Sequence, residues 1–96
     1  MDTKRYEQTS ENDEYRYFQP SWLEAMARGL TAGNEKHPNS TWKTIPSKEH
    51  AWRAVRHLIK YINDDTSDEH LLNASMRCMF AYCCDENNNK EAQRNE

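Results

Sequence analysis

Three segments of the chain carry apolar residues at helical spacing, and turn-forming or charged stretches separate them. The apolar positions of the first segment are Trp22, Leu23, Met26, Ala27 and Leu30. Ser21 and Glu24 have the spacing of a capping box, and Gly33 suits the left-handed position just past a helix end. We therefore predict a first helix over about residues 21–32, with this stripe buried.

The second segment, about residues 48–63, has the clearest period, and Ser47 is placed to cap its start. One arc of the predicted helix carries Ala51, Trp52, Val55, Leu58, Ile59 and Ile62. The opposite side carries Arg53, Arg56 and Lys60, with His57 adjacent to them. Because residues advance by about 100° along a helix, this is the pattern of an amphipathic helix.

A third helix is predicted over about residues 67–84, where Thr66 and Glu69 again have capping-box spacing. Its apolar positions are Leu71, Leu72, Met76, Met79, Phe80 and Cys83, and smaller residues extend them around the helix. A helix that is apolar over so much of its girth is buried on two sides, and we expect another subunit to cover one of them.

The remaining segments connect or flank these helices. Pro38 and Pro46 prevent helix continuity across the long loop 33–46. Residues 1–14 and 85–96 are polar, and we expect a disordered N-terminal segment and a polar tail around a helical body at 15–84. The prediction is an all-α, small three-helix domain with a long loop after the first helix and disordered termini.

Composition limits the size of the core. The chain has 96 residues, 35% of them hydrophobic and 30% charged, with two glycines and three prolines. So few turn formers argue against a turn-rich β architecture. A domain this small often gains buried area by self-association, so we expect a homo-oligomer. The polar N-terminal stretch and the lack of a run of about 20 apolar residues favour a cytoplasmic protein without a membrane segment.

The net charge of −3 is unevenly distributed. Residues 21–63 hold seven Lys/Arg and three Asp/Glu, whereas residues 64–96 hold three Lys/Arg and eight Asp/Glu. Duplex nucleic acid needs a larger basic field, so we expect no sequence-specific nucleic-acid binding. A basic middle between acidic flanks favours a small anion, and a nucleotide is the obvious candidate.

The candidate ligand-binding residues lie in the long loop and on the second helix. Lysines, arginines and loop amides bind phosphate, and an aromatic ring stacks on a base. The candidates are Lys36, His37, Trp42, Lys43, Arg53, Arg56, Lys60 and, from the aromatic cluster 15–18, Tyr17. Two alternatives remain open: Trp42 anchors the loop by packing, and the basic helix side is solvated or pairs with the acidic residues of 64–69.

Carboxylates gather between the second and third helices. Asp64 and Asp68 are candidate ligands of Mg²⁺, which takes one or two protein carboxylates together with substrate phosphates. Acidic residues at a helix start also cap the helix and favour its dipole without any metal. The cysteines lack the spacing of a zinc site and are expected to be reduced. His57 and His70 are the candidate catalytic or hydrogen-bonding histidines.

A series of residues resembles small bacteriophage proteins of the dATP/dGTP diphosphohydrolase N-terminal domain family. The series is Pro20…Leu23-Glu24-x-Met26-Ala27…Leu30-Thr31-x-Gly33-x-x-Lys36, Trp42-Lys43, Trp52…Arg56-His57-Leu58 and His70-Leu71-x-Asn73-Ala74. The segment before His70 is shorter than is usual in that family, and Asn73 stands where a second histidine is typical. The metal-handling half of the pattern is therefore less well kept than the anion-binding half.

The resemblance implies an all-helical protein that acts on purine deoxynucleoside triphosphates with Mg²⁺ in the cytoplasm of a phage host. By position it nominates Lys36, Trp42, Arg56, His57, Asp64 or Asp68, and His70. An enzyme would let water attack a phosphoanhydride. The alternatives are a non-catalytic protein that sequesters a purine nucleotide or a nucleotide-derived defence signal, and a phage protein that docks on a host protein.

Overall fold

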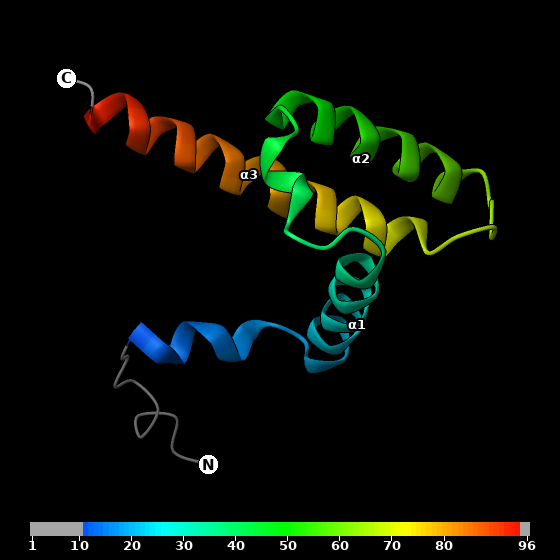
Figure 1. The fold of residues 1–96 in the computed structure, drawn as a ribbon. Coiled ribbons are helices and arrows are strands. Elements are labelled where there is room, and N and C mark those ends of the chain that lie inside the picture. Colours follow the sequence, from blue (N-terminus) through cyan, green and yellow to red (C-terminus); the bar gives the residue numbers. More distant parts are fainter. Residues whose placement is uncertain (1–10, 95–96) are drawn as a thin grey trace, which may run out of the picture.

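The computed structural model describes residues 11–94 and shows the predicted all-α architecture with three helices. These are α1 (Pro20–Lys36), α2 (Ser47–Ile62) and α3 (His70–Arg94), and the part described contains no strand. Two short 3₁₀ segments, η2 (Glu11–Tyr17) and η3 (Thr41–Thr44), precede α1 and α2. The helix α2 lies along α3, and α1 crosses beneath α3 (Figure 1).

A tight turn after α2 reverses the chain so that α2 and α3 run antiparallel (Figure 1). The amide of Asp65 donates to the carbonyl of Lys60, and the amide of Asp64 donates to the carbonyl of Tyr61. Asp64 takes the left-handed conformation, with φ of 60°. These are the features of a Schellman motif, in which Asp64 occupies the position that glycine usually takes.

The first helix differs from the prediction at both ends. It begins at Pro20, with Gln19 as the N-cap and no side-chain cap, so Ser21 does not form the expected capping box. It continues to Lys36, and the amide of His37 donates to the carbonyl of Gly33. Gly33 is therefore helical, with a negative φ, and is not the left-handed residue after the helix. No proline follows until Pro38, so the backbone can extend the helix by one turn.

The third helix starts later and ends later than predicted. It begins at His70, after Asp68 has accepted a hydrogen bond from the amide of Glu69. It continues through the segment 85–94, where the prediction placed a polar tail. This stretch lacks glycine and proline, so nothing in the sequence breaks the helix. Of the predicted disordered segment, residues 11–14 lie in η2, and residues 1–10 are outside the described residues.

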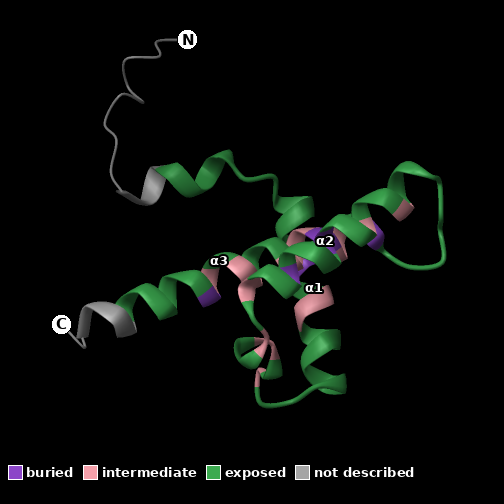
Figure 2. Cartoon of the chain, turned by 90° about the horizontal axis from the view of Figure 1, so that it is seen from above, coloured by how far each residue is buried: buried purple, intermediate pink, exposed green. Residues whose placement is uncertain are grey.

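The core is small and lies where the helices meet (Figure 2). Its buried hydrophobic residues are Met26, Ala54, Ala74 and Cys84, and two histidines, His50 and His70, are buried with them. A Cβ on Gly29 would lie 3.1 Å from the tip of Met76, so α1 packs on α3 at this glycine. None of the helices in the described part combines the length and hydropathy that a bilayer span requires.

The second helix turns an unexpected side toward α3. Its buried positions are His50 and Ala54, with His57 half-buried, and these face α3. The apolar arc that an amphipathic helix normally turns to the core is exposed, with Trp52 at 70% and Ile59 at 53%. Alanines at positions 54 and 74, both almost fully buried, keep the two helices close. The period was predicted correctly, and the side that faces inward was not.

Candidate functional site

A buried histidine joins three elements at one end of the α2–α3 contact. His50 is fully buried, its Nε2 lies 2.8 Å from the Trp42 carbonyl oxygen, and its Nδ1 lies 3.1 Å from an Arg77 nitrogen. A carbonyl only accepts hydrogen bonds and a guanidinium only donates them. The ring is therefore neutral, with Nε2–H donating to Trp42 and Nδ1 accepting from Arg77. This clamp fixes η3 against α2 and α3.

Trp42 is packed against the third helix. Its ring stacks on Phe80, with centroids 4.6 Å apart and planes inclined by 14°. The ammonium of Lys43 lies 5.7 Å from the Trp42 ring centroid, a cation–π distance. The stacking on Phe80 agrees with the alternative in which Trp42 anchors the long loop. Phe80 holds the Trp42 ring in place, and the cation–π contact with this ring positions the Lys43 ammonium.

A second polar cluster lies at the other end of the same contact. His57 Nδ1 is 3.0 Å from His70 Nδ1, and His70 Nε2 is 3.3 Å from an Asp65 carboxylate oxygen. Hydrogen bonds from the Ser67 side chain and amide, and from His70, hold the pKa of Asp65 well below its usual range. Desolvation lowers the pKa of His57, and the charges of His70, Arg77 and Lys60 act in the same direction.

One tautomer arrangement satisfies all of these contacts with neutral rings. His70 donates from Nε2–H to Asp65 and accepts at Nδ1 from the Nδ1–H of His57. The Nε2 atom of His57 is then left unprotonated, as a proton acceptor. An acceptor oriented by a second histidine and a carboxylate is the arrangement that general-base catalysis uses.

The other carboxylates serve the backbone. Asp68 accepts a hydrogen bond of 2.7 Å from the amide of Glu69, which is the main reason that its pKa is lowered. Asp64 is exposed at the turn after α2. Within residues 11–94 no three His, Cys, Asp or Glu side chains are grouped to hold one metal ion. One or two carboxylates with substrate phosphates need no such group, so Mg²⁺ at Asp64 and Asp68 stays a prediction.

The cations of α2 lie on the same side of the α2–α3 pair as η3. Two of them directly precede a residue that faces α3: Arg53 precedes Ala54 and Arg56 precedes His57, whereas Lys60 is half-buried and precedes the exposed Tyr61. In an antiparallel pair of right-handed helices, the residues that precede contact positions fall on one side of both helices. On α3 that side carries Phe80, on which η3 packs. Arg53 also pairs with Glu49 at 3.1 Å.

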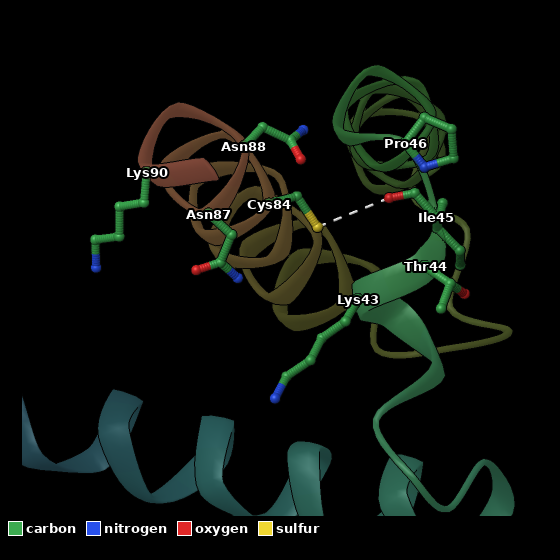
Figure 3. Close-up of a pocket in the computed structure, with 8 residues that line it drawn as sticks. All are labelled: Lys43, Thr44, Ile45, Pro46, Cys84, Asn87, Asn88 and Lys90. Atoms are coloured by element: carbon green, nitrogen blue, oxygen red, sulfur yellow. Dashed lines mark hydrogen bonds between the residues drawn. The ribbon is translucent and has the colours of Figure 1, made fainter. Parts of the chain in front are cut away.

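An open depression of about 560 Å³ lies between the end of η3 and the C-terminal part of α3. Its walls are formed by Lys43, Thr44, Ile45, Pro46, Cys84, Asn87, Asn88 and Lys90. The Cys84 thiol donates to the Ile45 carbonyl over 3.7 Å, and burial raises its pKa, so the thiol stays protonated (Figure 3). The described lining has two ammonium groups and no carboxylate, which is the composition of an anion site.

The predicted site residues do not all come together. Lys43 lines the depression, whereas Lys36 and His37 are exposed at the end of α1 and Tyr17 is exposed at the end of η2. Tyr17 has the guanidinium of Arg16 over its ring, at 5.7 Å. His57 and His70 meet, as described above, beside Asp65 and not beside Asp64.

Sequence reasoning missed His50, Arg77 and the far wall of the depression. The signal for His50 was present, because His50, Ala54 and His57 share one helical face, and so do His70, Ala74 and Arg77. Neither face carries large apolar residues, so apolar periodicity does not predict that either one is buried. Lys90 was missed because residues 85–96 were predicted to be a tail.

The fold defines a small all-α domain, and one of its sides is rich in cations that suit a small anionic ligand. A family model described as dATP/dGTP diphosphohydrolase, N-terminal, matches residues 2–94. The chain belongs to this family, and membership is consistent with nucleotide handling. Comparison with curated proteins found no match. Comparison with solved structures found none either.

Proposed function

We propose that the chain binds a purine deoxynucleotide, with its phosphates in the depression between η3 and α3. The observation that carries the proposal is the pair of lysines, Lys43 and Lys90, on opposite walls of a depression without a carboxylate in its described lining. Its volume, about 560 Å³, lies within the range of small-molecule sites. The family description supplies the class of ligand.

The two lysines are held in different ways. Lys43 is positioned by the Trp42 ring, which is itself stacked on Phe80. Lys90 pairs with Glu86 at 3.8 Å, and both side chains are largely exposed. An exposed pair of this kind contributes little, so Lys90 can leave Glu86 for a phosphate at small cost. Asn87, Asn88 and Thr44 add uncharged hydrogen-bonding groups to the same walls (Figure 3).

The test measures the affinity of the wild type for dATP and dGTP by calorimetry. Lys43→Ala with Lys90→Ala should weaken binding by at least about tenfold, which corresponds to about 1.4 kcal/mol. Lys48→Ala is the matched control, because Lys48 is exposed on α2 and outside the depression. A double variant that binds as tightly as the control contradicts the proposed site.

Arg56→Ala distinguishes two positions for the phosphates. Loss of affinity in Arg56→Ala but not in the lysine double variant would place the ligand along the cations of α2. No thermal shift of the wild type with any purine nucleotide would remove nucleotide binding, and docking on another protein would remain.

Hydrolysis is a second candidate function, and the chain of contacts from His57 through His70 to Asp65 favours it. In this reaction water attacks the α-phosphorus of the deoxynucleoside triphosphate, the α–β phosphoanhydride bond breaks and diphosphate leaves, and His57 Nε2 takes the proton from the water. The lowered pKa keeps His57 unprotonated at neutral pH. The metal-ion contribution would be charge neutralisation on the phosphates, with Asp64 and Asp68 as the predicted ligands.

Product analysis after incubation with dATP, dGTP and Mg²⁺ separates hydrolysis from sequestration. The hydrolysis candidate predicts deoxynucleoside monophosphate, and predicts that His57→Asn abolishes turnover while nucleotide affinity is kept. Recovery of the nucleotide intact from a protein that binds it would support sequestration.

A further inference from the structure

Large apolar side chains are exposed on the arc of α2 that does not face α3, and two more are exposed on α3. Val55 and Leu71 directly follow the contact positions Ala54 and His70, so they fall on one side of the antiparallel pair, and Trp52 and Ile59 lie further round α2, away from α3. We define the outer face as Trp52, Val55, Ile59 and Ile62 of α2 with Leu71 and Tyr82 of α3. All six are exposed, from 41% for Val55 to 73% for Ile62.

We infer that the outer face binds the same face of a second copy of this chain. Large exposed apolar patches are rare in a monomer and mark interaction sites. The buried hydrophobic residues of the described part are mostly small, so little apolar burial holds the monomer together. A second copy would add buried apolar area, because the contact between α2 and α3 within the chain uses the histidine-bearing side of α2.

Surface area agrees with this partner. The chain exposes 8366 Å², whereas a compact monomer of 11.4 kDa exposes roughly 5,800 Å². Part of the excess belongs to the end of α3 that projects beyond the other helices (Figure 1). The excess is larger than the roughly 800 Å² that a standard interface buries on each partner.

Charge agrees as well. The outer face lies on segments 51–62 and 71–82, and the cations of the first segment all lie on the side toward η3. Arg77, the charged residue of the second segment, points into the α2–α3 contact, where it meets His50. Two copies related by a two-fold axis would bring neutral surface against neutral surface, without like-charge repulsion. A charged macromolecular partner would find no complementary groups on this face.

The test is the mass of the protein in solution, measured by sedimentation velocity over a dilution series. The wild type should sediment as a dimer of about 23 kDa, or as a multiple of it, and dissociate on dilution. Ile59→Glu places a buried charge in the interface and should give a monomer that keeps the helical circular dichroism signal. Arg56→Glu, on the cationic side of the same helix, is the control and should retain the wild-type mass.

Two results would overturn the inference: a wild type that is monomeric at every concentration, or an Ile59→Glu protein that associates as the wild type does. If Ile59→Glu does not fold, the milder Ile59→Ser with Trp52→Ser should weaken association at least about tenfold, and unchanged association would have the same consequence. This surface lies on the opposite side from η3, so the outcome is independent of nucleotide binding.

Discussion

The two sides of α2 are used in the reverse of the usual way. The side against α3 carries His50, Ala54 and His57, and each histidine is hydrogen-bonded. The side facing outward carries the large aliphatic and aromatic residues. A surface helix normally buries its apolar stripe, because burial contributes about 25 cal/mol per Å². The proposed contact with a second copy of the chain would account for this difference.

The polar contact is fully satisfied, which is what makes this arrangement tolerable. Among the described residues no buried side-chain nitrogen or oxygen lacks a hydrogen-bond partner. Unpaired groups at this depth would each cost about 1–3 kcal/mol. The contact of α2 with α3 is therefore stabilised by complete hydrogen bonding, whereas a contact through the outward side of α2 would be stabilised by buried apolar area. Variants that change only one of these two sides distinguish their contributions.

Breaking the hydrogen bonds of His50 should have the largest effect. His50→Phe keeps an aromatic ring of similar size but leaves Arg77 without its acceptor and Trp42 without its donor. We expect the free energy of unfolding to fall by roughly 3 kcal/mol. Urea unfolding measures it, with His37→Phe as the control because His37 is exposed. A loss below about 0.5 kcal/mol would show that the clamp is not formed.

Enlarging one buried and one exposed alanine of α2 compares the stability cost at the two kinds of position directly. Ala54→Leu forces a larger side chain into the contact with α3 and should cost about 1–3 kcal/mol. Ala51→Leu, at an exposed position of the same helix, should leave the free energy of unfolding within about 0.5 kcal/mol of the wild type or raise it. Thermal unfolding compares the two. The reverse order would mean that the apolar arc faces inward.

A smaller, stabilising effect is expected at Gly33. Its φ is not positive, and no atom outside its own helical backbone lies within 4 Å of the position that an alanine Cβ would take. Gly33→Ala should therefore raise the free energy of unfolding by about 0.5–1 kcal/mol, which urea unfolding measures. Gly29→Ala should gain less, because the new methyl group meets Met76 at 3.1 Å. Destabilisation by Gly33→Ala would mean that Gly33 takes the left-handed conformation just past the helix end, as the sequence predicted.

The smallest effect is a pH dependence. The folded pKa of His57 lies below its ordinary value of 6.5, so the unfolded chain binds more protons in the window below 6.5. Stability is therefore fully present above pH 6.5 and declines as pH falls toward the folded pKa. Asp65 adds a further loss below its ordinary value of 3.8, because its folded pKa is also lowered. In the profile of melting temperature against pH, His57→Asn should reduce the decline below pH 6.5. An unchanged profile would mean that other groups cause this decline.

Sequence patterns predicted the helices better than their environment. The period placed all three helices, since apolar spacing reports helical structure whichever surface covers it. It did not reveal the inward side of α2, because apolar residues were assumed to face the chain's own core. For this reason Trp52 is exposed where a buried residue was expected, and His50 is buried where an exposed residue was expected. Positions that pair residues far apart, such as His50 with Arg77, depend on how α2 and α3 are rotated.

The candidate site was predictable in part. Lys43, His57 and His70 belong to the predicted set of site residues, whereas the contact between the two histidines was not predicted. Lys90 and Asn87 were not predictable, since their contribution depends on α3 continuing beyond residue 84. The role of Asp65 depends on a turn geometry in which it accepts from the amide of Ser67 over 2.8 Å.

The orientation of α2 places its histidines toward α3 and its apolar residues outward. Nuclear magnetic resonance of the ¹⁵N-labelled histidine rings tests it most directly, because His57 Nδ1 and His70 Nδ1 are only 3.0 Å apart. We predict a scalar coupling between these two nitrogens across their hydrogen bond. The absence of a coupling between the two nitrogens would contradict it.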